Sequence, residues 1–98
     1  MGDFNKIIKR EKPTLVDFYA TWCGPCKMMP PILEDLKKRI GDKASVIKID
    51  VDKNQRLAQK LNIRGVPTLV LYKGGKIVWR QSGVRQAGEL EQVINKYL

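Results

Sequence analysis

The chain has 98 residues, of which 43% are hydrophobic and 30% charged, with 19 lysines and arginines against 10 acidic residues. This composition is typical of one soluble globular domain over 1–98 and excludes a disordered chain or a fibre, and no apolar run approaches the about 18 residues of a membrane span. The absence of histidine excludes Cys–His and Ser–His–Asp catalysis, and two cysteines are too few for a four-ligand zinc site within one chain.

The net charge of +9 is spread along the chain and forms no basic tail or block. Its densest cluster, Lys37-Lys38-Arg39, falls late in a predicted helix, where cations suit the helix dipole. A surface that follows nucleic-acid phosphates is usually more concentrated than this. We therefore expect no nucleic-acid partner and interpret the charge as a solvated surface that favours acidic protein partners.

The hydrophobic pattern of the first half predicts a helix, a strand and a second, longer helix. Asp3 is placed to cap a short helix with apolar residues at i, i+3 and i+4, which Lys12-Pro13 ends. The segment 14–20 is nearly continuous in apolar character, as is typical of a central strand buried on both faces. A long helix is predicted over 23–40, with a kink at Pro30-Pro31.

The second half predicts three more strands and two helices. In chain order these are a strand over 45–51, a helix over 54–61, a strand over 68–72, a Gly74-Gly75 hairpin turn, a strand over 77–79 and a helix with Leu90, Val93, Ile94 and Tyr97 on one face. The strand–helix–strand order predicts right-handed parallel crossovers, and the terminal hairpin adds an antiparallel edge. The fold class is therefore α/β, a mixed sheet with helices on both faces in three layers.

A cysteine pair with C-x-x-C spacing follows the first predicted strand, in the sequence WCGPCK at 22–27. Cys23 falls at a predicted helix start, where unpaired N–H groups, the helix dipole and Lys27 favour a thiolate, the nucleophile of disulfide exchange. Cys26, one turn later, is placed to attack the resulting mixed disulfide and release the reduced product. The Gly24-Pro25 dipeptide suits the turn, because proline tolerates the first turn of a helix.

Three other roles for the two cysteines explain less of the pattern. Half of an intermolecular metal site would need ligands from a second chain. A purely structural disulfide would close a very short loop, with a small entropic benefit. Two buried core cysteines would not account for the position at a helix start. We therefore interpret the pair as a redox disulfide and expect no metal.

WCGPCK together with a later V-P-T at 66–68 is very specific, and at these residues the sequence resembles the thioredoxin family over nearly its whole length. The matching positions are VDFYATWCGPCK at 16–27, Pro31, Lys48, Asp50, RGVPTL at 64–69, the Lys73-Gly74-Gly75 turn and Gly83. The resemblance implies a thioredoxin-like fold of about four strands flanked by four helices. The family usually begins with a further strand, which is missing here.

The resemblance also implies roles for Asp17 and Lys48, which would lie beneath the cysteines. Burial of a carboxyl in an apolar strand raises its pKa, and Lys48 in the adjacent strand would offset part of that rise. Asp17 would then act as general base for Cys26 during its attack, with a water as the intermediary where one is needed. The alternative is that both residues are ordinary solvated strand residues.

Pro67 and an apolar rim around the cysteines are further site residues by resemblance. X-Pro bonds are cis in only about 5–6% of cases, so the sequence alone predicts a trans bond. The resemblance instead implies a cis-proline that faces the cysteines and whose neighbour pairs its backbone with an extended substrate. The rim residues would be Trp22, Gly65, Val66, Gly83 and Val84, with ordinary core and turn roles as the alternative.

These features predict a thiol–disulfide oxidoreductase that reduces protein disulfides and acts as a monomeric, general cytosolic electron donor. By resemblance, an NADPH-linked flavoprotein, thioredoxin reductase, would re-reduce it; the chain has no glycine-rich nucleotide site, so we expect no cofactor of its own.

The absence of an apolar signal core predicts a cytoplasmic protein. Because the Gly24-Pro25 dipeptide lacks a histidine that would stabilise the thiolate, we expect a reductant. An oxidase or isomerase in an oxidising compartment and a redox-inactive or dual-use binding module of a larger complex are the alternatives.

Overall fold

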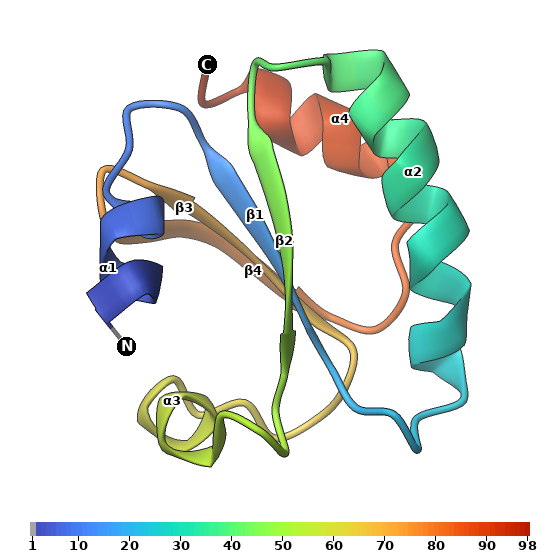
Figure 1. The fold of residues 1–98 in the computed structure, drawn as a ribbon. Helices are drawn as coiled ribbons and strands as arrows, with labels where there is room; N and C mark the ends of the chain where they lie inside the picture. The colour runs from blue at the N-terminus through green and yellow to red at the C-terminus, as the bar shows by residue number, and fades with distance from the viewer. Residues whose placement is uncertain (1) are drawn as a thin grey trace.

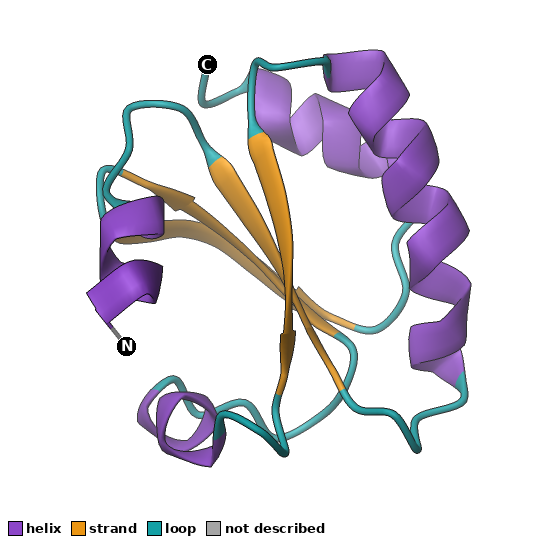
Figure 2. Ribbon diagram, in the orientation of Figure 1, coloured by secondary structure: helices purple, strands orange, loops and turns teal. Residues whose placement is uncertain are grey.

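The computed structural model describes residues 2–98, which fold into a mixed four-stranded sheet between two layers of helices (Figure 1). The elements are α1 (Gly2–Ile8), β1 (Thr14–Tyr19), the 3-10 helix η1 (Pro25–Met28), α2 (Met29–Ile40), β2 (Ser45–Asp50), α3 (Gln55–Lys60), β3 (Thr68–Lys73), β4 (Lys76–Ser82) and α4 (Ala87–Asn95). Figure 2 shows α1 and α3 on one face of the sheet and α2 and α4 on the other. The predicted three-layer α/β architecture with four strands is confirmed.

β1 lies in the interior of the sheet, as its apolar sequence predicts. The strand order is β2-β1-β3-β4, so β1 forms hydrogen bonds to a neighbour on each side. Its first five residues are fully buried because helices cover both of its faces. Side chains alternate between those faces, so Leu15 points toward α2 and α4 while Val16 and Phe18 point toward α1 and α3. Asp17 therefore shares the face of Leu15.

One predicted connection is wrong, because β3 runs antiparallel to β1. β1 and β2 are parallel as expected, but the helix between β2 and β3 does not return the chain to the start of the sheet. α3 has six residues and spans about 9 Å, whereas a six-residue strand is about 20 Å long. The chain therefore enters β3 from the same end at which β2 stops (Figure 1).

The long helix predicted over 23–40 is divided in the structure. A 3-10 turn, η1, covers Pro25–Met28, and the α-helix α2 begins at Met29. Pro30 and Pro31 consequently occupy the first turn of α2, where no backbone N–H is needed, and the kink predicted within a helix interior becomes a junction between two helices. The Gly74-Gly75 hairpin turn is confirmed, since both glycines have positive φ, 60° and 83°.

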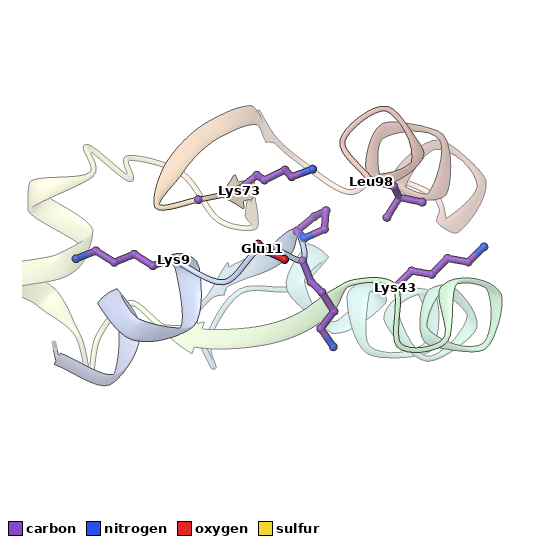
Figure 3. A pocket seen from close by; sticks show the side chains of 8 residues that line it. Lys9, Glu11, Lys43, Lys73 and Leu98 are labelled. Carbon is purple, nitrogen blue, oxygen red and sulfur yellow. The ribbon is translucent and has the colours of Figure 1, made fainter.

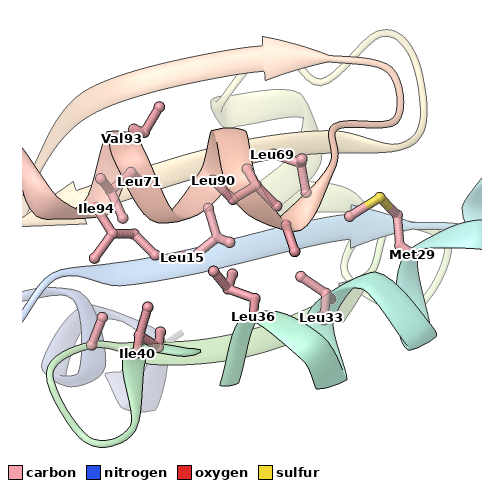
Figure 4. Packing of buried hydrophobic residues seen from close by; sticks show 12 residues of the cluster. Leu15, Met29, Leu33, Leu36, Ile40, Leu69, Leu71, Leu90, Val93 and Ile94 are labelled. Atoms are coloured by element: carbon pink, nitrogen blue, oxygen red, sulfur yellow. The ribbon is translucent and has the colours of Figure 1, made fainter. Parts of the chain in front are cut away.

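The larger of the two main hydrophobic cores lies between the sheet and the helices α2 and α4. Figure 4 shows Leu33 and Leu36 of α2 and Leu90 of α4 meeting the strand residues Leu15 and Leu69. The second core, on the opposite face, is built around Phe18 and Val70 with α1 and α3. Both cores pack against β1 and β3, and the end of β1 pairs with the start of β3 at the edge of the sheet where the cysteines lie. No helix within residues 2–98 has the length and apolarity needed to cross a membrane.

Candidate active site

The two cysteines lie in the connection that follows β1 and form a disulfide with each other. Their Cα atoms are 5.3 Å apart, and Cys23 N–H donates to the Ala20 carbonyl at 3.2 Å, which fixes the turn after the strand. Both side chains are shielded, with 4% of Cys23 and 6% of Cys26 exposed. The exposed fractions of the two cysteines are nearly equal and do not show which one attacks a client. The backbone groups around each sulfur provide that distinction.

Cys23 Sγ has a backbone donor directed at it. The N–H of Cys26 donates to this sulfur at 3.2 Å, and the carbonyl oxygen of Val66 lies 3.5 Å from it on the opposite strand connection. A donor aimed at a sulfur stabilises its anionic form in preference to the neutral thiol. The predicted helix-start position is close to what is observed, since Cys23 directly precedes Gly24, the N-cap of η1.

Asp17 is fully buried, with 0% of its surface exposed. Burial raises the pKa of this carboxyl from its ordinary 3.8 to about 6, and the positive charge of Lys48 opposes part of that rise. Within residues 2–98, neither carboxyl oxygen of Asp17 has a hydrogen-bond partner. The alternative of a solvated strand residue is therefore wrong for Asp17, which is a buried titratable group without a fixed partner.

Lys48 stands opposite Asp17 in the parallel pairing of β1 and β2, as the sequence pattern predicted. Its side chain is exposed, and its ammonium group lies 4.9 Å from the centre of the Tyr19 ring. This cation–π contact holds the charge at the sheet surface, near the carboxyl and in reach of solvent. Both interpretations of Lys48 are therefore partly correct, because it is the neighbour of Asp17 in the sheet and its side chain is exposed to solvent.

The Val66-Pro67 peptide bond is cis, as the family resemblance implied and the sequence alone did not. Two hydrogen bonds hold this turn. Thr68 Oγ1 donates to the Gly65 carbonyl at 2.6 Å, and the N–H of Gly83, whose φ is 93°, donates to the Pro67 carbonyl at 2.8 Å. The turn thereby brings the Val66 carbonyl against the Cys23 sulfur.

A shallow groove of about 210 Å³ lies beside the cysteines, and Trp22 forms one wall of it. This indole is 71% exposed, and its Nε1–H donates to Asp52 Oδ2 at 2.8 Å. Gly65 and Val66 of the predicted rim also line the groove. The other two rim residues do not line the groove: Gly83 donates its N–H to the Pro67 carbonyl, and Val84 packs against the core under α2 and α4.

Sequence reasoning assigned no role to four residues that build this groove. Asp52 anchors Trp22, and the lining also includes Val51, Ile63 and Arg64. They come from the residues that directly follow β2 and from the segment before the cis-proline, which the antiparallel entry of β3 brings together. Among the four, Arg64 belongs to the RGVPTL match at 64–69, and that motif is the sequence signal that points to it.

A pocket of about 570 Å³ lies beside Pro13 and Gly74, at the end of the sheet opposite the cysteines, and Figure 3 shows the side chains that line it. Four lysines line it together with Glu11, namely Lys9, Lys12, Lys43 and Lys73. The predicted even spread of charge holds along the sequence, whereas the fold gathers these four cations at one end. The labelled Lys9 and Lys43 side chains extend away from each other in Figure 3, so their ammonium groups do not converge on a common point.

Comparison with known proteins places the chain in a family. The thioredoxin family profile matches residues 1–96. The chain is 47% identical over 98 residues to thioredoxin Y, chloroplastic, of Oryza sativa subsp. japonica, covering 99% of this chain and 58% of the rice protein. It is 44% identical over 88 residues to the thioredoxin of Bacillus subtilis strain 168, covering 90% of this chain and 85% of that protein.

Solved structures agree with the sequence matches. The structure of a mutant thioredoxin from Halobacterium salinarum NRC-1 superimposes with a TM-score of 0.89 at 40% identity, covering 99% of this chain and 84% of the other. A mitochondrial thioredoxin 3 from Saccharomyces cerevisiae, in its oxidised form, gives 0.86 at 36% identity over 97% of this chain and 88% of the other. The chain belongs to the thioredoxin family, and its Cys23–Cys26 pair makes it a thiol–disulfide oxidoreductase.

Proposed function

We propose that the protein reduces disulfides of other proteins, with Cys23 as the attacking cysteine. The observation that carries this assignment is the Cys26 N–H directed at Cys23 Sγ at 3.2 Å, which favours the thiolate at that sulfur. In the reduced protein, this thiolate attacks one sulfur of the client disulfide. A bond forms between Cys23 and the client, and the client's other sulfur leaves as a thiolate.

The second step releases the client. The thiolate of Cys26 attacks Cys23 Sγ, the Cys23–Cys26 disulfide forms, and the second client sulfur leaves with the bonding electrons. Two electrons thus pass from the cysteine pair to the client. Asp17 is the group that we propose accepts the Cys26 proton, because a buried carboxyl with a pKa of about 6 is poised to exchange a proton near neutral pH. Lys48 is proposed to limit the cost of charging it.

We propose that an extended client segment binds across the groove. The backbone next to Pro67 offers hydrogen-bonding groups to such a segment, in the manner of an added strand. Trp22 supplies exposed apolar surface on one side, while Gly65 and Val66 form the other side without large side chains. Gly24, Pro25 and Lys27 would then shape the approach to Cys23 from the η1 side.

The electrons are proposed to come from a thioredoxin reductase, an NADPH-linked flavoprotein, with this protein as a monomeric donor in the cytoplasm. The thioredoxin of Bacillus subtilis is among its relatives. Another relative carries a chloroplastic designation, and a structural neighbour at 34% identity comes from work on a yeast mitochondrial peroxiredoxin and the glutathione and thioredoxin systems. The family therefore serves several compartments, and the cytoplasm is our proposal for this member.

Insulin reduction tests this function. With dithiothreitol as electron source, the wild-type protein is expected to accelerate the precipitation of the insulin B chain well above the uncatalysed rate. With NADPH and a bacterial thioredoxin reductase in place of dithiothreitol, turnover is expected to continue as NADPH is consumed. Failure to accelerate the reaction with either donor would instead indicate a binding module with idle cysteines.

Trp22→Ala is expected to lower kcat/KM for insulin by about fivefold to thirtyfold, mainly through KM. The substitution removes the exposed indole that lines the groove, and large aromatic contacts at an interface contribute about 1–2 kcal/mol. Met28→Ala is the matched control, because Met28 is 54% exposed but does not line the groove. An equal loss in both variants would contradict a specific role for the groove.

Turnover with the reductase is expected to fall severalfold as salt is raised. The chain carries +9, so attraction to an acidic reductase or client accelerates encounter at low ionic strength. Salt shortens the Debye length from about 30 Å at 0.01 M to about 8 Å at 0.15 M. Initial rates over this range, at substrate concentrations below KM, are the measurement, and salt-independent rates would contradict a role of the charge in partner choice.

A further inference from the structure

The guanidinium of Arg80 binds two carbonyl groups at the C-terminal end of α3. Arg80 lies in β4 opposite Val70 of β3, so both side chains project from the face covered by α1 and α3. Its Nη1 donates to the Leu61 carbonyl, and its Nη2 donates to the Asn62 carbonyl at 2.7 Å. Arg80 thus joins the last strand to the residues that follow α3.

Both carbonyls lie just past the last residue of α3, Lys60, and Arg80 donates to each of them. The last carbonyls of a helix have no intrahelical N–H, and a cation near them also suits the helix dipole. At Asn62 the chain reverses with φ of 55°, and Ile63 N–H returns to the Ala58 carbonyl at 2.9 Å. A planar fork of donors can hold two successive carbonyls at once, which a single ammonium cannot. Arg80 therefore fixes the direction in which the chain leaves α3.

The segment that follows α3 forms the wall of the groove opposite Trp22. Ile63, Arg64, Gly65 and Val66 follow directly and line it opposite Trp22. The far end of this wall is fixed by the Thr68–Gly65 hydrogen bond and by the turn at Pro67. The near end, within residues 2–98, is held by Arg80 and by the backbone turn at Asn62.

We propose that Arg80 is a positioning residue for client binding, which acts by holding the groove wall 62–66 in the conformation that receives an extended client. This proposal rests on the proposed function, since it concerns binding at the same groove. Arg80 does not touch the sulfurs, so its effect is expected in the affinity for large clients. The reaction of Cys23 with a small disulfide, which needs no groove, is expected to be independent of it.

The test compares R80Q, R80K and the control K76Q, which removes one positive charge from an exposed position of the same strand. R80Q is expected to raise KM for insulin about fivefold to tenfold, the scale of the net contribution of one ordinary hydrogen bond, with kcat within about twofold. R80K is expected to recover part of the loss. The reaction of the reduced variants with 5,5′-dithiobis(2-nitrobenzoic acid) is expected to match wild type. An unchanged KM in R80Q, or the same rise in K76Q, would overturn the proposal.

Amide hydrogen exchange supplies a readout that does not depend on activity. R80Q is expected to accelerate exchange at Asn62 and Ile63, whose N–H groups donate to the Gln59 and Ala58 carbonyls at the start of the wall, while the amides of β1 stay protected as in wild type. Unchanged exchange at these two amides would overturn the proposal even if KM rose. A wild-type protein that fails to reduce insulin would instead overturn the proposed function, and the exchange result would still decide whether Arg80 holds the wall.

Discussion

Replacing Cys23 with serine is expected to reduce insulin turnover to the uncatalysed rate. Serine is nearly isosteric, but its hydroxyl is not ionised near neutral pH and forms no mixed disulfide, so the first step has no nucleophile. The measurement is the initial rate with dithiothreitol at equal concentrations of wild-type and variant protein. Rates equal to those of the wild type would show that the cysteine pair does not carry the activity.

Cys26→Ser is the informative companion to this variant, because both lose turnover for different reasons. Cys23 remains able to attack in Cys26→Ser, but nothing resolves the mixed disulfide, so a stable adduct with the client is expected. Mass spectrometry of the variant mixed with oxidised insulin is expected to find this adduct at Cys23. An adduct that forms with Cys23→Ser and not with Cys26→Ser would reverse the roles assigned to the two cysteines.

Asp17→Asn is expected to raise the free energy of unfolding at pH 7 by about 3 kcal/mol. The folded pKa of about 6 lies above the ordinary value of 3.8, so the folded protein holds this proton more tightly than the unfolded chain does. The stabilisation that protonated Asp17 contributes to the wild-type protein is fully present below pH 3.8 and is lost as the pH rises through about 6. The gap between the two values corresponds to about 3 kcal/mol above that window.

Urea unfolding between pH 4 and pH 8 measures this effect. Asparagine resembles the protonated carboxyl and does not titrate, so the two proteins are expected to have similar stability near pH 4 and to diverge as the pH rises. Glu34→Gln is the control, because Glu34 is exposed on α2. A constant difference between wild type and Asp17→Asn across the pH range would contradict burial of an ionisable carboxyl at this position.

Asp17→Asn is also expected to lower the turnover number for insulin by about a hundredfold at pH 7, the lower end of the range for loss of a general base. The loss is expected in the second step, so the mixed disulfide at Cys23 accumulates during turnover. Rapid acid quenching and mass spectrometry measure that accumulation. A slower first step with no accumulated adduct would show that Asp17 does not serve Cys26.

Local sequence patterns predicted the elements of this fold well, because each element is dominated by its own hydrophobic period. The apolar segment 14–20 could only be buried on both faces, and β1 is. The direction of β3 was not predictable in the same way, since it depends on how far a short helix carries the chain across the sheet. The junction before Met29 was missed because a 3-10 turn and an α-helix share the same apolar spacing over four residues.

The candidate site shows the same difference between features set by neighbouring residues and features set by residues far apart in the chain. The spacing of Cys23 and Cys26 is local, and the sequence alone identified their chemistry. The conformation of Pro67 came from the family resemblance, because the sequence alone favoured a trans bond. The bond from Trp22 to Asp52 and the fork of Arg80 join residues far apart in the chain, and no periodicity connects them. Such contacts follow from the sheet order and were visible only in three dimensions.

The equilibrium reduction potential of the Cys23–Cys26 pair tests most directly whether the protein is a reductant. The protein is equilibrated with defined ratios of reduced and oxidised glutathione, and the oxidised fraction is read after acid quenching and thiol alkylation. A potential below the cytosolic glutathione poise of about −220 to −260 mV is predicted, since no histidine stabilises the thiolate between the cysteines. A potential above that poise would contradict the reductase, and one near or above about −180 mV would indicate an oxidase or isomerase.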